Sequence, residues 1–358
     1  MKTRFLTLIC ALLLLVSLVS CTATQTPAGQ TTEPAGDAST EPTEEGTSSA
    51  QPSEPVAVRV YTLNGTTGFG MARLMEDAAN GAFPNVNYSI EVKTDPATEV
   101  LPALIKGEVD IAALPTNAAS VVYNKTNGGV RILAINTLGC LYLVTTDGST
   151  VTSLADLAGK TVCVPAQNPT FLATHLLAAN GLSESVTLDS SSYAQPADLR
   201  DAVAAGAVEI AILPEPMVTI AKATAAKNGK TVDVQLDLTA EWDKLPGEAG
   251  TLVQGCVVVR TAFLEEHPET VAEFLRAYKS SVEYVNSNTE EAAALIARYG
   301  IFANEAVAKN AIPRCNIAYL DGADMRAAME TYLGILFTVN PTAIGGALPG
   351  ADFYYPAQ

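Results

Sequence analysis

The chain contains two copies of one short segment. GEVDIAALPTNAA at residues 107–119 matches GAVEIAILPEPMV at residues 206–218, at a shift of 99 residues. In each copy a helical stretch precedes a glycine, Gly107 or Gly206, which suits a helix end because glycine adopts a positive φ at little cost. A short apolar strand follows and ends at Pro115 or Pro214, since proline interrupts a strand ladder. The repeat predicts two similar halves.

A weaker match extends the duplication upstream. VYTLNGTTGFGMARLM aligns with VCVPAQNPTFLATHLL at a shift of 102 residues, which places Phe69 on Phe171. Both copies are typical of a strand, a polar loop and a helix, and this alternation predicts two α/β lobes with mainly parallel sheets. Ligands of such sheets bind at the carboxyl ends of the strands. We therefore expect the loops at 64–70, 115–120, 165–170 and 214–217 to face one shared cleft.

Two long apolar runs are expected to connect the lobes. Leu133 to Val144 is interrupted by Gly139, and Thr251 to Val259 is interrupted by Gly255. Each run is long enough to cross from one lobe to the other, so Gly139 and Gly255 are the predicted hinge positions. After the second run the sequence becomes helical, and HPETVAEFLRAY predicts a helix that begins at Pro268.

The N-terminal residues predict export and lipidation. Lys2 and Arg4 precede an apolar run that has the length of a signal-peptide core and is short for a membrane span. The run ends in Leu-Val-Ser-Cys at residues 18–21, which resembles the bacterial lipobox, where the cysteine receives lipid. The alternative is a short anchor helix with an incidental cysteine. Residues 22–55 contain no aliphatic residue larger than alanine apart from proline, and no aromatic or basic residue, so we expect a disordered tether.

Composition limits the classes of function. The net charge is −17 over 358 residues, and an acidic chain argues against nucleic-acid binding, which needs a basic surface. His175 and His267 are the two histidines; neither has a sequence context typical of a catalytic triad, and the spacing of histidines and cysteines is not that of a zinc site. We expect no catalytic residues, no metal and no cofactor. The four cysteines beyond Cys21 are either small buried residues or partners in a disulfide: Cys140, Cys163, Cys256 and Cys315.

The glycine-rich segment GTTGFG at residues 65–70 invites comparison with nucleotide-binding turns. A dinucleotide turn has the order G-x-G-x-x-G, and a phosphate loop continues with Gly-Lys-Ser/Thr, whereas Met71 and Ala72 follow here. Two interpretations remain: the glycines permit a tight strand-to-helix turn, or they let the polar end of a ligand approach a helix start, where N–H groups are unpaired.

Polar residues of the four loops are the candidate solute contacts. Phe69 either stacks on a ring of the solute or only anchors its own helix. Glu215, the repeat equivalent of Thr116, either accepts a hydrogen bond from the solute or is a solvated carboxylate at the rim. Arg314, in IPRCNIAY, either meets an anion across the cleft or pairs with an acid of the protein. The predicted ligand-binding residues are Asn64, Gly65, Thr66, Thr67, Gly68, Phe69, Thr116, Asn117, Asn168, Thr170, Glu215 and Arg314.

In their order along the chain, several segments resemble one protein family. The segments are the lipobox, ALIKGEVDIAALPTNAA, SLADLAGKTVCVP, AVAAGAVEIAILPEP and VVVRTAFLEEHPETVAEFLRAY. They look like the lipid-anchored substrate-binding proteins of ABC importers, in particular the SsuA/TauA/THI5-like (NMT1-like) group. The resemblance implies a type II periplasmic-binding-protein fold of the α/β class, with two Rossmann-like lobes joined by a two-strand hinge, which closes around a solute and then docks on a permease.

The resemblance leads to an organisation of the chain. The expected parts are a signal peptide (1–20), a lipid-anchored disordered linker (21–55), the first part of lobe 1 (56–139), lobe 2 (140–252), and the return to lobe 1 with C-terminal helices (253–358). The implied partners are a small organic solute, an ABC permease with its ATPase, and the outer face of the cell membrane through lipidated Cys21. A monomer is expected.

Two other functions are also compatible with the sequence. An enzyme could reuse the fold as a synthase or hydrolase, or a surface receptor could report the solute without importing it. The sequence departs from the pattern expected for two solutes of the family, because the first loop has no basic residue to hold a sulfonate or a nitrate. The clustered cysteines of the pyrimidine-synthase branch are also absent from the sequence.

Overall fold

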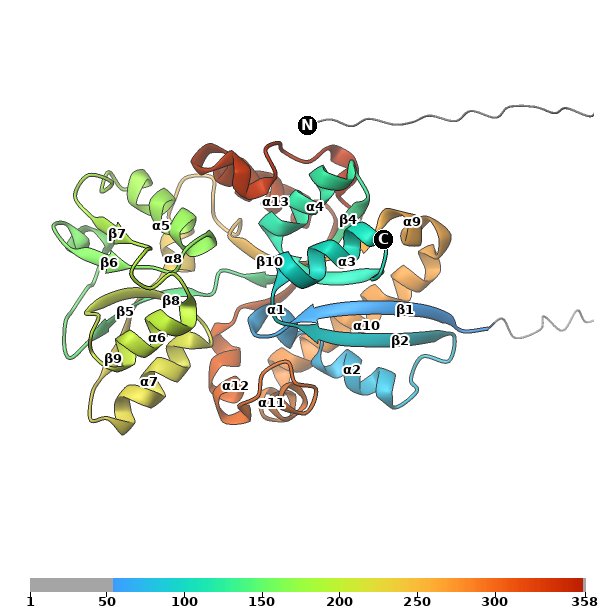
Figure 1. Ribbon diagram of the computed structural model, residues 1–358, viewed down its shortest axis with the longest axis horizontal. Helices are drawn as coiled ribbons and strands as arrows, with labels where there is room; N and C mark the ends of the chain where they lie inside the picture. Colours follow the sequence, from blue (N-terminus) through green and yellow to red (C-terminus); the bar gives the residue numbers. More distant parts are fainter. Residues whose placement is uncertain (1–53, 357–358) are drawn as a thin grey trace, which may run out of the picture. The chain divides into compact units, whose positions relative to one another are not determined.

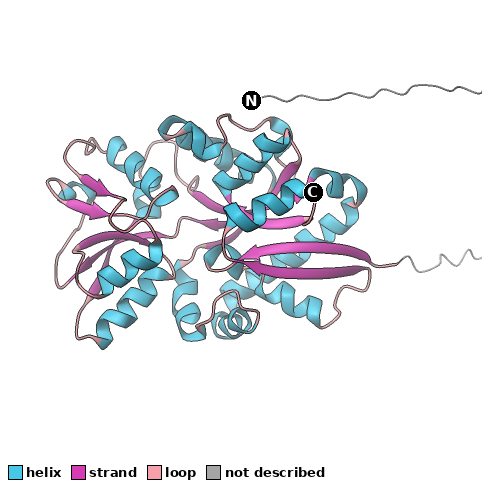
Figure 2. Cartoon of the chain, in the orientation of Figure 1, coloured by secondary structure: helices cyan, strands magenta, loops and turns pink. Residues whose placement is uncertain are grey.

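The computed structural model describes residues 54–356 (Figure 1). The predicted signal peptide, Cys21 and nearly all of the predicted linker lie outside the described residues. Helices surround two separate β-sheets (Figure 2). Within residues 54–356, none of the helices combines the length and the apolar character that crossing a membrane requires.

The first sheet has six strands in the order β11-β4-β10-β3-β1-β2. Strands β1, β2 and β3 are parallel, whereas β10 runs antiparallel to both β3 and β4, and β11 antiparallel to β4. The bounds are β1 (Val56–Leu63), β2 (Val86–Lys93), β3 (Ile111–Pro115), β4 (Val130–Leu138), β10 (Val253–Arg260) and β11 (Ile317–Leu320).

The second sheet has five strands in the order β7-β6-β8-β5-β9. Strands β6, β7 and β8 are parallel, and β5 is antiparallel to β8 and β9. This sheet forms the green-to-yellow part of the ribbon in Figure 1. The bounds are β5 (Leu141–Thr146), β6 (Thr161–Cys163), β7 (Thr187–Asp189), β8 (Ile210–Pro214) and β9 (Val232–Asp237).

Both sheets follow one plan, which confirms the duplication that the sequence predicts. In each, three parallel strands adjoin an antiparallel strand that enters directly from the other half of the chain. The strands β4 and β9 run in the same direction as the three parallel strands of their sheets, so most strands of each sheet run one way, as predicted, although both sheets are mixed. The strand β4 runs parallel to β3 toward the place where the chain crosses from the first sheet to the second. The strand β5 begins at this crossing, so it must run away from it and antiparallel to β8.

The glycines and prolines that the sequence predicts at the ends of helices and strands lie at those ends in the structure. Gly107 ends α3 (Leu101–Lys106) with φ 74°, and Gly206 has φ 70° just after α6 (Pro196–Ala204). The strands β3 and β8 end at their prolines, and α10 (Pro268–Ser287) begins at Pro268.

The helices and turns connect the strands and cover the sheets. Their bounds are α1 (Thr66–Phe69), α2 (Ala72–Ala79), η1 (Pro96–Val100), α3 (Leu101–Lys106), α4 (Thr116–Thr126), η2 (Leu154–Leu157), α5 (Asn168–Ala179), α6 (Pro196–Ala204), α7 (Met217–Lys227), α8 (Leu238–Trp242), α9 (Thr261–Glu266), α10 (Pro268–Ser287), α11 (Thr289–Arg298), α12 (Glu305–Ala311), η3 (Ile312–Arg314), α13 (Gly322–Val339), η4 (Pro341–Ile344) and η5 (Ala351–Phe353).

The strands divide between the sheets at two places along the chain. The first sheet takes strands before residue 139 and after residue 252, and the second sheet takes those between. The predicted lobe limits fall at these divisions, and the limits themselves stay a prediction. Helix α13 follows the last strand of the first sheet yet packs against α5 of the second. There the Tyr332 ring lies 5.9 Å from the ring of Trp242, which ends α8.

A buried carboxylate joins three strands of the first sheet. Asp110 precedes β3 and is 2% exposed. Its oxygens accept from Arg59 Nε at 2.9 Å and Arg59 Nη2 at 2.7 Å, and also from Arg260 Nη2 at 2.7 Å. Burial acts to raise the pKa of Asp110, but the hydrogen bonds from the two arginines outweigh it, so the pKa lies below its ordinary value.

The repeat supplies a matched control for this network, because the position of Asp110 corresponds to exposed Glu209 in the second copy. We expect Asp110→Asn to lower the free energy of unfolding by about 1.5 to 3 kcal/mol, since it weakens charged hydrogen bonds to a buried oxygen pair. Glu209→Gln should change it by less than about 0.5 kcal/mol. Urea denaturation of the two variants measures the difference.

Lowering the pH should remove the stabilisation that ionised Asp110 provides. Because the folded pKa of Asp110 is depressed, its stabilisation is present above the unfolded value of about 3.9 and is lost as pH falls through the folded pKa. The native protein and Asp110→Asn should therefore converge in stability as pH falls below about 4. A difference between them that did not depend on pH would show that the charge of Asp110 contributes nothing.

Candidate functional site

The four loops that the sequence singles out contact one another in two pairs. Thr66 follows β1, and its Oγ1 donates to the main-chain oxygen of Glu215, which follows β8, at 2.9 Å. Asn168 follows β6, and its Nδ2 donates to Oδ1 of Asn117, which follows β3, at 2.9 Å. Each pair joins a residue from one sheet to a residue from the other, so the carboxyl ends of the two sheets face each other.

The two pairs are related by the internal duplication. The shift of 102 residues relates Thr66 to Asn168, and the shift of 99 residues relates Thr116, the neighbour of Asn117, to Glu215. The loop after the first strand of each half therefore contacts the loop after the third strand of the other half. Reciprocal contact of this kind is what two similar units facing across an approximate two-fold axis produce.

Glu215 forms an ion pair between the two halves. Its Oε1 accepts from Arg314 Nε at 2.6 Å, and its Oε2 accepts from the backbone N–H of Thr219 at 3.1 Å. Arg314 Nη2 also donates to Thr219 Oγ1 at 2.8 Å. Glu215 is 2% exposed, so the interpretation of a solvated carboxylate at the rim is wrong. Of the two interpretations for Arg314, the structure confirms the pair with an acid of the protein.

The first loop is shaped by close packing. Gly65 has φ 84°, and a Cβ on Gly68 would lie 1.8 Å from the main-chain oxygen of Leu63, so both positions suit glycine. The Phe69 side chain is completely buried and meets Phe302 edge to ring at 6.1 Å. Of the two interpretations for Phe69, the structure therefore has the anchor of its own helix.

The remaining predicted contacts differ in what they offer a solute. Asn64 is exposed, and Thr67 is half-buried with its backbone oxygen accepting from Asn136. The hydroxyls of Thr116 and Thr170 donate to main-chain oxygens nearby, which makes them positioning groups for their loops. The ligand-binding role of all twelve residues stays a prediction.

The crossing between the sheets carries polar groups that the sequence analysis missed. Asn136 Nδ2 donates to backbone oxygens of Thr67 and Cys256, at 3.2 and 3.3 Å. Gln254 Oε1 accepts from the backbone N–H of Cys140 at 2.9 Å. The signal that could have found both is an amide side chain inside an otherwise apolar strand, LAINTLG or LVQGCVVV.

The two predicted hinge glycines have different surroundings. Gly139 lies between β4 and β5, where a Cβ would be 2.2 Å from Thr239 Oγ1 and 2.5 Å from Leu252 Cδ2. Gly255 lies inside β10, where a Cβ would be 2.4 Å from Asn136 Oδ1. Both glycines make room for neighbouring polar groups or for the second crossing, and their role as a hinge stays a prediction.

Two thiols lie beside the same contacts and are weakly acidic. Burial, with a smaller contribution from the charge of Glu215, raises the pKa of Cys140 to about 12. Burial also raises the pKa of Cys315, whose Sγ lies 3.9 Å from Thr66 Oγ1. All four cysteines of the described residues are free. Such thiols remain protonated near neutral pH and are poor nucleophiles.

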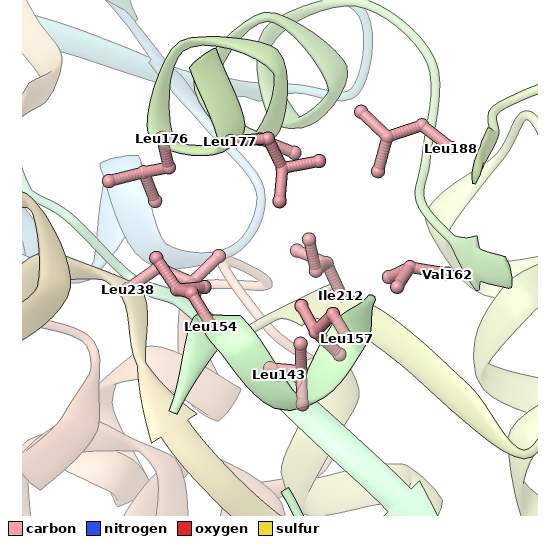
Figure 3. A pocket seen from close by; sticks show the side chains of 10 residues that line it. Leu143, Leu154, Leu157, Val162, Leu176, Leu177, Leu188, Ile212 and Leu238 are labelled. Carbon is pink, nitrogen blue, oxygen red and sulfur yellow. The ribbon is translucent and has the colours of Figure 1, made fainter. Parts of the chain in front are cut away.

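Cavities elsewhere in the second half do not involve the predicted contacts. Figure 3 shows an apolar cavity between α5 and the second sheet, where Leu176 and Leu177 face Leu143 and Ile212. Its volume is about 10 Å³, which is at the lower limit for one water molecule, and its lining offers no polar partner. A groove of about 510 Å³, lined in part by Lys160 and Glu209, lies beside β6 and β8.

Packing at the first crossing generates a test. We expect Gly139→Ala to lower the free energy of unfolding by about 1 to 3 kcal/mol, because its methyl group overlaps Thr239 and Leu252. Gly334→Ala in α13 is the matched control, since a Cβ there meets nothing within 4 Å and alanine favours a helix by about 0.5 to 1 kcal/mol. Thermal denaturation should show opposite signs for the two variants. Equal effects would contradict the close packing at Gly139.

Comparison with known proteins provides a family and related structures. A model of the family described as NMT1/THI5 like matches residues 86–292. An ABC transporter protein from Parabacteroides distasonis is 25% identical, with a TM-score of 0.69, over 85% of this chain and 100% of that one. No curated protein sequence matches the chain.

More distant structures share the fold. The periplasmic aliphatic sulphonate binding protein SsuA from Escherichia coli is 16% identical, with a TM-score of 0.64, over 82% of this chain and 96% of that one. The ligand binding component of an ABC-type import system from Staphylococcus aureus, with zinc bound, is 14% identical, with a TM-score of 0.60, over 84% of this chain and 97% of that one. The chain thus has the two-lobed type II periplasmic-binding-protein fold of these proteins.

Proposed function

The chain belongs to the NMT1/THI5-like family, and we propose that it is the extracytoplasmic solute-binding component of an ABC importer. The observation that carries the proposal is the reciprocal contact between the loops of the two sheets, Thr66 with Glu215 and Asn117 with Asn168. A site assembled from both lobes binds its solute most tightly when the lobes are closed, and so couples capture to a change of shape that a permease can recognise.

The proposed mechanism alternates between an open form and a closed form. In an open form the lobes separate about the crossings near Gly139 and Gly255, and the polar loop groups become hydrated. A small organic solute enters, contacts both lobes at once and favours the closed form, because its binding energy is largest there. The closed form docks on the permease, and a cytoplasmic ATPase drives release. The proposed solute contacts are the predicted loop residues given above, with Phe69 supporting the first loop from behind, because its side chain is completely buried.

The proposal includes the cellular setting. Lipidation of Cys21 would hold the protein at the outer face of the membrane, with residues 22–55 as a tether that lets a monomer reach the permease. Support for this setting comes from the lipobox and from the polar composition of the tether. The lobe limits at 139/140 and 252/253 belong to the same proposal.

An enzyme on this fold is the second candidate, and the site gives it little support. Catalysis by a nucleophile needs an adjacent base. Of the described histidines, His175 pairs with Glu248 at 2.8 Å beside Trp242, and His267 adjoins Glu266 on the surface. The thiols of the interlobe contacts have raised pKa values. We therefore propose that the solute leaves chemically unchanged.

Recovery of the solute tests the proposal. The protein is purified, denatured by heat, and the released small molecules are identified by mass spectrometry. We expect one solute in roughly equal amount to the protein, and the purified solute should raise the thermal midpoint of protein from which it has been removed. Consumption of the added solute would support the enzyme. A solute that binds but is not imported by cells with the permease would support a receptor.

A substitution in the first loop locates the site. Thr67→Trp places a large ring in a half-buried loop position, so it should abolish the stabilisation by the recovered solute and leave the far-ultraviolet circular dichroism unchanged. Thr338→Trp, at an exposed position of α13, is the matched control and should bind normally. Unchanged affinity in Thr67→Trp would move the solute away from this loop.

A further inference from the structure

One buried amide connects the first loop, residues 64–70, to both strands at the crossings between the sheets. Asn136 lies on β4, shortly before Gly139, and is 1% exposed. Its Nδ2 donates to the backbone oxygen of Cys256 on β10 at 3.3 Å and to that of Thr67 in the first loop at 3.2 Å. Both crossings and a predicted solute loop are therefore joined by a single side chain.

The surroundings of Asn136 fix the orientation of its amide. Thr137 Oγ1 donates to Asn136 Oδ1 at 3.0 Å, so the oxygen and the nitrogen of the amide have different partners. A Cβ on Gly255 would lie 2.4 Å from Oδ1, so glycine at this position leaves room for the amide. A buried amide in an apolar strand is costly unless its donors and its acceptor are paired, and both sides of this amide have partners in the protein.

The first loop needs support of this kind because its helix is short. Helix α1 has four residues, and the last C=O groups of a helix have no partner within it. Asn136 supplies a donor to one of these groups, the oxygen of Thr67. The preceding residue, Thr66, makes the 2.9 Å hydrogen bond to Glu215, which follows β8 of the second sheet. A displacement of the loop would break this contact.

We infer that Asn136 is a positioning residue for solute capture, which holds the first loop against β4 and β10 so that Thr66 reaches Glu215 when the lobes close. The inference rests on the proposed function, because it assigns Asn136 a role in the closure of that same site. Rotation of the lobes bends β4 and β10 where they leave the first sheet, and the Asn136 amide transmits this movement to residues 64–70. Opening at the crossings and movement of the first loop are thereby coupled.

The duplication supplies a matched control for Asn136. The shift of 99 residues relates it to Gln235 on β9, which also carries an amide within a strand. Gln235 Nε2 donates to Thr145 Oγ1 at 2.9 Å, and its Oε1 accepts from the backbone N–H of Val151 at 3.2 Å. These partners belong to the second half of the chain, so Gln235→Ala removes a comparable amide at a distance from the contact between the lobes.

Two cysteines can report whether the lobes are closed. Cys140 and Cys315 are 8% and 0% exposed, and Cys315 Sγ lies 3.9 Å from Thr66 Oγ1. Separation of the lobes would expose both thiols to a reagent such as iodoacetamide. Cys256 is also completely buried but lies within β10, so its thiol becomes exposed when the sheet unfolds. Labelling of Cys315 relative to Cys256 thus distinguishes opening from loss of structure.

Removal of the amide tests the inference. The probe is the small-molecule extract that heat releases from the native protein, titrated into solute-free native protein, Asn136→Ala and Gln235→Ala, with the labelling rate of Cys315 as the readout. We expect Asn136→Ala to need roughly tenfold more extract for half-maximal protection, the effect of losing two hydrogen bonds of ordinary strength. Gln235→Ala should need the native amount, and Cys256 should be labelled equally slowly in all three proteins. Unchanged protection of Cys315 in Asn136→Ala would overturn the inference.

A double-mutant cycle separates the positioning of Thr66 from a general weakening of the protein. Thr66→Val removes the hydroxyl that contacts Glu215 and should weaken the protection of Cys315 by itself. If Asn136 acts by holding Thr66 in place, adding Thr66→Val to Asn136→Ala should cost little more, because the contact is already lost. Fully additive effects of the two substitutions would contradict the positioning role.

Thr137→Val serves as the test if Asn136→Ala does not fold. It removes the hydroxyl that orients the Asn136 amide, and we expect it to need about threefold more extract for half-maximal protection of Cys315. An unchanged requirement would overturn the inference and leave solute capture intact. If no extract protects Cys315 in the native protein, the result counts against the proposed function itself.

Discussion

Two hydrogen bonds between loops, from Thr66 to Glu215 and from Asn168 to Asn117, define how the two halves of the chain meet. Each half places its first and third strands in parallel, so the loops after them emerge at one edge. The strand that enters from the other half must run away from that edge. Duplication of a single plan thus makes two polar edges that are complementary to each other, and a solute between them contacts both.

One ion pair holds part of the contact between the lobes. The structure pairs Arg314 with a carboxylate of the chain, where nearly complete burial of Glu215 makes the pair costly to separate. Amide groups at the other reciprocal contact provide directional hydrogen bonds without net charge. The E. coli structural neighbour is named for aliphatic sulphonates, and with 16% identity it shares the fold. Similar lobes can therefore present different chemistry, because the loops that carry the site are not what stabilises the sheets.

Local patterns in the sequence predict those features of the fold that depend on residues close together in the chain. The repeat around Pro115 and Pro214 identifies two lobes, and the polar loops after the strands identify the edges that meet. The partners of individual side chains are not encoded locally. Whether Glu215 is solvated or paired depends on Arg314, 99 residues away. Asn136 was missed because its role comes from contacts with Thr67 and β10, which only the folded chain brings together.

Hydrogen–deuterium exchange tests most directly whether the solute lies between the lobes. The protein as purified is compared with the same protein after unfolding, removal of small molecules and refolding. Bound solute should slow exchange of the backbone amides in residues 64–70 and 116–120 of one lobe and in residues 165–170 and 214–219 of the other, all together. Protection confined to one lobe, or to the groove beside Lys160 and Glu209, would contradict capture between the lobes.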